Sequence, residues 1–196
     1  KTQMFVPGSH RLACLTPADG SEYWHVDEKG LPEQYVASPC FDGKNFFMAA
    51  GFPTHHVIAV KPDGKGDVTK SHVLWHTKDV SCYVPSPVLA GNALFVADDR
   101  GTASAFDTKT GEKIWKERMG NHYSASLIAT KKHVFFVADN GITKIVKAGA
   151  EPGVVEENPL GEFTFASPAV ANGRLYIRGE KHLFCIGDKS VAAASR

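Results

Sequence analysis

A short segment that begins with serine recurs four times, and this repetition constrains the fold more than any other feature. The copies begin at Ser38, Ser86, Ser126 and Ser167, so their spacings are 48, 40 and 41 residues. Each copy has two apolar runs separated by a short turn, as in SPVLAGNALFVADD and SPAVANGRLYIRGE. A fixed period near 40 residues is typical of repeat proteins, in which each repeat is one supersecondary unit.

The clearest copy spans residues 86–115 and has the pattern of four short strands. It predicts strands over 86–90, 93–97, 102–106 and 112–116, which are separated by turns rich in Gly, Asn and Asp. Short apolar and β-branched runs between such turns favour antiparallel hairpins. Four antiparallel strands in about 40 residues form one blade of a β-propeller, so we expect an all-β chain built of such blades.

The two ends of the chain match this unit incompletely. Residues 4–8 and 11–15 and the segment around Trp24 correspond to the second, third and fourth strands, so the first copy lacks the innermost strand. The last copy has strands over 167–171, 174–178 and 182–186 and lacks the outermost one. We therefore expect three complete blades and two partial ones.

The approximate bounds of the five blades are 1–36, 37–84, 85–124, 125–165 and 166–187, and residues 188–196 form a small, polar tail. Such a chain either closes on itself with about four blades or forms an arc of a larger propeller. We expect the arc, because the chain opens inside a strand and therefore looks like the C-terminal part of a longer protein.

Charge and hydropathy exclude some classes of function. The chain has 22 Lys and Arg against 21 Asp and Glu, so its net charge of +1 gives no reason to expect nucleic acid as a partner. No apolar run approaches the roughly 18 residues that a membrane helix needs, and no signal peptide is visible in this segment.

The cysteines and histidines predict neither a disulfide framework nor a metal site. Cys14 and Cys185 fall where other copies have alanine, and Cys40 falls where they have valine or alanine, so we expect buried thiols. Adjacent residues of an extended chain point to opposite sides, so His55 and His56 are poorly placed to bind one metal ion. We expect His25 and His76, on the outer strands, to face solvent.

The acidic turns have two interpretations. Asp98-Asp99 and Asp139-Asn140 occupy equivalent turns, and their oxygens would suit Ca²⁺. Asp and Asn are also the usual residues of tight turns, and this interpretation is favoured. Nothing else in the sequence has the spacing of a nucleophile elbow or a phosphate-binding loop.

The complete blade motif resembles the repeat of the pyrroloquinoline-quinone (PQQ) type β-propellers. It consists of SPVLAGNALFV followed by D-x-x-T-G-x-x-x-W, which ends at Gly111 and Trp115. The resemblance covers nearly the whole chain. It implies that a set of tryptophans and glycines locks neighbouring blades together, here Trp24, Trp75, Trp115, Gly20 and Gly111.

The fourth copy departs from this motif, because residues 151–163 contain no tryptophan. The interface that follows this copy should therefore be looser than the others. The alternative is that it is repacked around Val154, Val155 and Phe163.

The resemblance implies two functional types. Quinoprotein dehydrogenases hold PQQ and calcium in the channel of a large propeller, typically with a vicinal disulfide against the cofactor. No two cysteines are adjacent in this sequence. The other type comprises non-catalytic binding propellers outside the cytoplasm, in the periplasm or secreted. We expect the second type, with no catalytic residue, no metal and no visible cofactor; the C-terminal arc of a PQQ-dependent alcohol or sugar dehydrogenase is the alternative.

The entrance to each innermost strand is the candidate binding site for a protein, peptide or glycan. In a four-stranded blade these entrances share one face, at the mouth of the central channel. The residues that recur at this position are Gln34, Tyr35, Tyr83, His122, Tyr123, Phe163 and Thr164. Repeated tyrosines there could form a ring that binds a partner. The favoured interpretation is that the tyrosines pack between adjacent blades and hydrogen-bond a neighbouring backbone.

Overall fold

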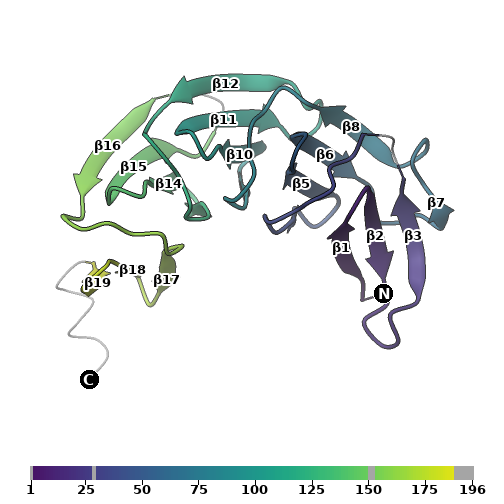
Figure 1. Cartoon of the computed structure of the whole chain (residues 1–196), viewed down its shortest axis with the longest axis horizontal. Helices are drawn as coiled ribbons and strands as arrows, with labels where there is room; N and C mark the ends of the chain where they lie inside the picture. The colour runs from purple at the N-terminus through teal and green to yellow at the C-terminus, as the bar shows by residue number, and fades with distance from the viewer. Residues whose placement is uncertain (1, 28–29, 150–152, 188–196) are drawn as a thin grey trace.

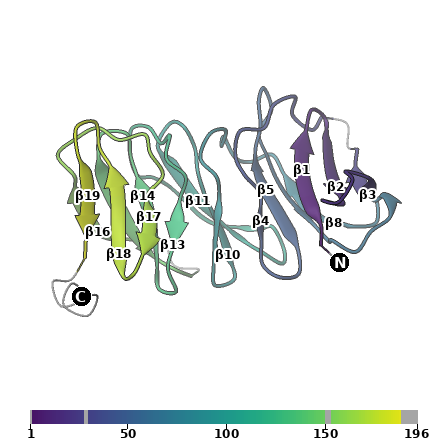
Figure 2. The same ribbon diagram turned by 90° about the horizontal axis from the view of Figure 1, so that it is seen from below.

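Five small sheets, in which nearly all strand pairs are antiparallel, follow one another along the chain in a computed structural model that describes residues 2–27, 30–149 and 153–187. The sheets form an arch, with the outer strands on its convex side (Figure 1) and the inner strands on its concave side (Figure 2). The expected all-β arc of propeller blades is therefore confirmed. The predicted tail at 188–196 lies outside the described residues.

The strands agree closely with the repeat. Blade 1 contains β1 (Met4–Gly8), β2 (Arg11–Leu15) and β3 (Glu22–Val26); blade 2 contains β4 (Cys40–Phe41), β5 (Phe46–Ala50), β6 (His56–Val60) and β8 (Val73–Thr77). Blade 3 contains β9 (Val88–Ala90), β10 (Ala93–Ala97), β11 (Thr102–Asp107) and β12 (Lys113–Arg118). Blade 4 contains β13 (Ile128–Ala129), β14 (His133–Val137), β15 (Ile142–Lys147) and β16 (Val154–Pro159), and blade 5 contains β17 (Ala169–Ala171), β18 (Arg174–Arg178) and β19 (Leu183–Ile186).

Blade 1 also has a fourth strand, which the repeat does not predict. The segment between β6 and β8 of blade 2 crosses to blade 1, where β7 (Gly66–Asp67) pairs in parallel with β3. The amide of Val68 donates to the carbonyl of His25 at 2.9 Å, and the Asp27 amide donates to Thr69 Oγ1 at 2.8 Å. The first two blades are thus joined by backbone hydrogen bonds as well as by side chains.

Each of the first four blades has a register irregularity at the same place. It lies in the pairing of the third strand with the outermost strand, close to the connection between them. Such β-bulges increase local twist and redirect side chains. The residue just beyond the bulge on the outer strand is Trp24, Trp75 or Trp115 in blades 1 to 3 and Glu156 in blade 4. The register therefore gives the exact structural equivalence of these four positions.

The tryptophans pack between blades. The Trp75 Nε1 group of blade 2 donates to the carbonyl of Thr108 in blade 3 at 3.0 Å. Gly111 has φ +73°, and a Cβ there would lie 2.5 Å from the Trp75 ring. Trp24 makes the corresponding bond to the Pro62 carbonyl at 2.9 Å and lies beside Gly64. Gly20 has the same turn conformation, but nothing lies within 4 Å of its Cβ position, so it locks no blade within the described residues.

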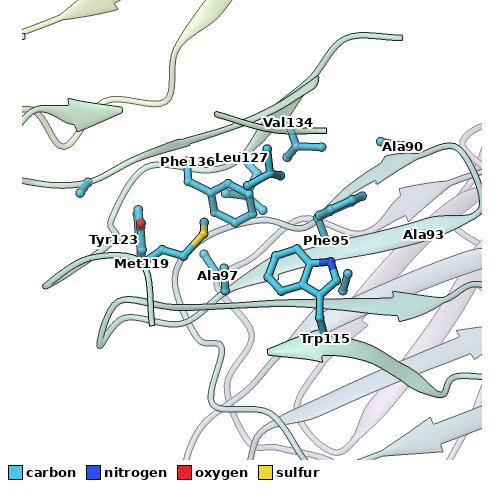
Figure 3. Close-up of a cluster of buried hydrophobic side chains, with 14 residues drawn as sticks. Ala90, Ala93, Phe95, Ala97, Trp115, Met119, Tyr123, Leu127, Val134 and Phe136 are labelled. Carbon is cyan, nitrogen blue, oxygen red and sulfur yellow. The ribbon is translucent and has the colours of Figure 1, made fainter. Parts of the chain in front are cut away.

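Three buried clusters join blades 1 to 4. Trp24 belongs to the cluster between blades 1 and 2, and Trp75 packs against the cluster between blades 2 and 3. Trp115 belongs to the cluster between blades 3 and 4, where its ring centroid lies 6.0 Å from that of Phe95 (Figure 3). Buried apolar surface between sheets is the main source of stability in such a repeat.

A line of serine hydrogen bonds also connects the blades. The amides of Ser38, Ser86 and Ser126 donate to the Oγ atoms of Ser86, Ser126 and Ser167, at 2.9, 3.1 and 2.9 Å. Each bond thus runs from one blade to the next at the entrance of the innermost strand. The serines that define the sequence repeat are therefore structural links between blades.

The interface between blades 4 and 5 differs from the others, and of the residues expected to fill it, Val154 and Phe163 are exposed. Val154 is 39% exposed and Phe163 is 58% exposed, and the side chain of Val155 lies outside the description. Instead, a pocket opens in this interface.

The cysteines are free thiols, but only part of the core prediction holds. Cys14 and Cys82 are buried and Cys40 is half-buried, and burial raises the pKa of Cys14 to about 11 and that of Cys40 to about 12. Cys185 is exposed, contrary to expectation, because the described residues place no further strand or blade against β19.

Candidate functional site

The entrance loops of the innermost strands lie at one end of the blades, together with the turns between the second and third strands. We call this surface the mouth face; it comprises loops 30–39, 78–87, 119–127 and 160–168 and turns 51–55, 98–101, 138–141 and 179–182. Within blades 2 to 4 each loop is bonded to the turn of its own blade. The contacts are Gln34 with Phe52, Val84 with Asp99, and Ser124 with Asp139.

Two of the candidate residues at the recurring position are buried. Tyr123 is fully buried in the cluster between blades 3 and 4, with its ring centroid 6.1 Å from that of Phe136 (Figure 3). Burial raises the pKa of the Tyr123 hydroxyl. Thr164 is also buried, and its hydroxyl donates to the Arg178 carbonyl at 2.8 Å. These two side chains pack in the interior and are not accessible to a ligand.

A second group of candidates meets between blades 2 and 3. The Tyr83 hydroxyl donates to Gln34 Oε1 at 2.9 Å, and the Phe52 and Tyr83 rings have centroids 5.6 Å apart. Gln34 and Phe52 exchange two backbone hydrogen bonds, each of 3.1 Å. Tyr35 is half-buried against the cluster of blades 1 and 2. Gln34, Phe52 and Tyr83 therefore form one preorganised patch at the mouth, of which the sequence did not indicate Phe52.

His122 is exposed and belongs to an acid–imidazole pair on blade 4. Its Nδ1 lies 2.6 Å from Asp139 Oδ2, and the Ser124 hydroxyl donates to the same oxygen at 2.9 Å. A nucleophilic serine would need its hydroxyl bonded to the base, whereas here the hydroxyl is bonded to the carboxylate. The arrangement therefore fixes the loop before β13 and leaves the outer edge of the imidazole exposed.

Blade 5 contributes an open pocket of about 470 Å³ to the mouth face. Phe163, Phe165, Arg178 and Glu180 line it, together with Thr164 and Gly179. The side chains of Phe163 and Phe165 are 58% and 64% exposed. The Glu162 carboxylate accepts hydrogen bonds from the amides of Lys181 and His182, which fixes turn 179–182. Exposed aromatic side chains beside an Arg and a Glu are typical of interaction sites.

His56 and His76 form a pair beneath the mouth face, contrary to the expectation that His76 faces solvent. His56 is buried; its Nδ1 lies 2.5 Å from His76 Nε2 and its Nε2 lies 3.0 Å from Thr54 Oγ1. Burial is the main cause that lowers the pKa of His56 to about 4, and the nearby charges of His76 and Lys78 add to it. An N–H group on one ring can donate to an unprotonated nitrogen of the other ring, whereas two N–H groups facing each other would repel.

This pair predicts a pH dependence of stability. The ordinary pKa of 6.5 applies to His56 in the unfolded chain, so the unfolded state binds more protons between about pH 6.5 and pH 4. The contribution is therefore present above that range and lost as the pH falls through it. We expect His56 to account for a loss of about 2–3 kcal/mol between neutral pH and about pH 4, measured by urea unfolding.

The His56→Phe variant should lose that part of the pH dependence. An unchanged slope in His56→Phe would contradict the assignment.

The described residues do not fit a PQQ and calcium site. They contain no cluster of three or more His, Cys, Asp or Glu side chains that could hold a metal ion. Asp98 accepts from the amides of Arg100 and Thr102, and Asp139 accepts from Ser124, so both acidic turns use their oxygens to hold loops. The described part of the chain also has no helix that could cross a membrane.

The arc of four-stranded blades, with tryptophan of one blade packed on glycine of the next, defines a PQQ-type β-propeller repeat protein. The model of one protein family, described as outer membrane protein assembly factor BamB, matches residues 8–155. The match covers about three quarters of the chain, and the chain belongs to this family.

Two curated proteins are similar over about half of the chain. The outer membrane protein assembly factor BamB of Burkholderia pseudomallei is 30% identical over 105 residues, which cover 49% of this chain and 25% of that protein. The tetrathionate hydrolase of Acidithiobacillus ferrooxidans is 27% identical over 113 residues, which cover 52% of this chain and 21% of that enzyme. The matched segments thus span a quarter or less of these relatives.

Solved structures share the fold at low identity. BamB from Moraxella catarrhalis superposes with a TM-score of 0.68 at 14% identity, over 93% of this chain and 56% of that one. The computationally designed protein Ika8 gives 0.69 at 11% identity, over 94% and 57%. A europium-containing methanol dehydrogenase gives 0.52 at 16% identity, over 69% and 26%. These likenesses show the fold alone.

Proposed function

We propose that this chain is a non-catalytic propeller segment whose mouth face binds an extended segment of a protein outside the cytoplasm. The observation that carries the proposal is the set of exposed apolar side chains at this face. They are Val36, Phe52, Phe163 and Phe165, and each is about half exposed or more. Large exposed apolar side chains gathered on one face are typical of binding surfaces.

The chemistry of the face favours a peptide over a glycan. Phe52 and Tyr83 form an aromatic step beside the Gln34 amide, and the blade 5 pocket adds two phenylalanines with one Arg and one Glu. Rings anchor apolar side chains of a partner, and the polar groups can bond its backbone. The names of the BamB relatives support a partner from outer membrane protein assembly and a location outside the cytoplasm.

A binding titration with substitutions at the mouth tests the proposal. The probe is an outer membrane β-barrel polypeptide kept unfolded by rapid dilution from urea, with fluorescence anisotropy as the readout. Phe52→Ser and Phe163→Ser should each weaken binding about tenfold, as expected for aromatic anchors. Phe41→Ser is the matched control, because Phe41 is 48% exposed, similar to the 49% of Phe52, but lies at the opposite end of blade 2.

Equal weakening by Phe41→Ser, or no effect of the two mouth substitutions, would contradict binding at this face. The enzymatic alternative has its own test. Dye reduction in the presence of alcohols or sugars, after the protein is incubated with PQQ and Ca²⁺, would instead support a quinoprotein oxidoreductase.

A further inference from the structure

The interface between blades 4 and 5 contains a pocket of about 420 Å³, and Leu160 is the one lining residue that also belongs to the mouth face. Both sheets supply its walls, and its apolar lining consists of Phe135, Ile145, Pro159, Leu160, Leu175, Ile177 and Ile186. Three polar side chains, Thr143, Glu156 and Asn158, complete it. The volume and the mainly apolar lining with a few polar groups are those of a small-molecule site.

The pocket corresponds position by position to the core between blades 2 and 3. In the strand registers, Phe135, Thr143 and Ile145 of blade 4 are equivalent to Phe47, Val57 and Ala59 of blade 2. Leu175, Ile177 and Ile186 of blade 5 are equivalent to Leu94, Val96 and Phe106 of blade 3. Equivalent positions in the two interfaces are therefore mostly apolar. Between blades 2 and 3 they form a buried cluster, and between blades 4 and 5 they line a pocket.

One of the two interfaces contains an indole ring, and the described part of the other does not. Between blades 2 and 3, the Trp75 ring lies 6.0 Å from the Phe47 ring and packs against the closed cluster. The equivalent residue of blade 4 is Glu156, which is exposed. Ile145 is larger than Ala59, so it fills part of the missing volume, but the remaining pocket is still large enough for a bicyclic ring.

We propose that this pocket binds a small, uncharged, planar aromatic molecule with a ring N–H group, of the size of indole. The apolar walls match an aromatic ring because the equivalent cluster between blades 2 and 3 packs against the Trp75 indole. The Glu156 carboxylate, the Thr143 hydroxyl and the Asn158 amide oxygen supply hydrogen-bond acceptors for the N–H group. The negative charge of Glu156 disfavours an anionic ligand.

Isoleucine methyl signals report directly on this pocket. The chain has seven isoleucines, of which Ile145, Ile177 and Ile186 line the pocket. With isoleucine methyl labelling and millimolar indole as the probe, these three signals should shift together and saturate with one dissociation constant. Ile58 and Ile114, which pack in other interfaces, should not shift. Absence of saturable shifts, or equal shifts at all isoleucines, would overturn the proposal.

A variant that restores the repeat provides the second test. Ile145→Ala combined with Glu156→Trp recreates the pair that Ala105 and Trp115 form in blade 3. This variant should bind indole at least tenfold more weakly and melt at a higher temperature. Glu157→Trp is the matched control, because the next residue of a strand points to the other face, and it should keep wild-type binding.

Retained indole binding in the restored variant would also overturn the proposal. If this variant does not fold, the methyl titration of the native chain decides. N-acetyltryptophanamide distinguishes a free small molecule from a tryptophan side chain of a partner protein. If it binds more tightly than indole, the pocket would be assigned to such a side chain, and the proposal of a small-molecule ligand would be overturned.

Discussion

Trp115→Ala is expected to lower the free energy of unfolding by about 3–5 kcal/mol. The side chain is 7% exposed within the cluster that joins blades 3 and 4, and it contacts Phe95 edge-on. Its removal leaves a cavity between two sheets that the rigid backbone of each blade cannot close. Urea unfolding followed by circular dichroism measures the loss, and a change below about 0.5 kcal/mol, typical of surface sites, would contradict the buried position.

Phenylalanine substitutions separate the size of the ring from its hydrogen bond. Trp115 Nε1 is buried and has no hydrogen-bond partner among the described residues, whereas Trp75 Nε1 donates to the Thr108 carbonyl. Trp115→Phe should therefore lose only packing. Trp75→Phe should lose packing and also about 1 kcal/mol for the hydrogen bond and the carbonyl left without its donor. The reverse order of the two losses would contradict this difference.

Gly111→Ala is expected to destabilise the protein by about 2–5 kcal/mol, for two separate reasons. The residue has φ +73°, a conformation that L side chains rarely adopt. The new Cβ would also lie 2.5 Å from the Trp75 ring, so the indole or the turn must move and the contact between blades 2 and 3 is disturbed. Thermal and urea unfolding of the variant measure the combined effect.

Gly20→Ala is the matched control for this substitution. Gly20 occupies the same turn position in blade 1 with φ +75°, but nothing lies within 4 Å of its Cβ position. This variant should show only the backbone cost, about 1–2 kcal/mol. Equal losses at the two glycines would mean that the contact with Trp75 contributes nothing.

The blades were predictable because strand and turn signals are local. The expected strands at 4–8, 11–15, 93–97 and 174–178 agree with β1, β2, β10 and β18 at both ends. Turn residues and apolar runs decide these bounds within a few residues of each strand. The equivalence of Cys14, Ala59 and Ala105 also followed from aligning the copies, and the registers confirm it.

Contacts between blades were harder to predict, because they depend on residues some 40 positions apart. The serines aligned the copies, but nothing in that alignment showed that each Oγ accepts an amide from the preceding blade. The insertion before β8 gave no signal that β7 would join blade 1. At the mouth, sequence position alone could not distinguish the buried Tyr123 from Tyr83, which bonds Gln34, because burial depends on the neighbouring blade.

Because β7 crosses from blade 2 to the sheet of blade 1, the stability of the arc should differ between its two ends. Because β7 ties the first two blades by backbone bonds as well as by Trp24, they behave as one cooperative unit. At the other end, blade 5 couples to its neighbour without a tryptophan and across a pocket. In a chain of nearest-neighbour couplings the weakest link sets where opening starts. Fluctuations should therefore begin at blade 5 and propagate toward the N-terminal pair, which opens last.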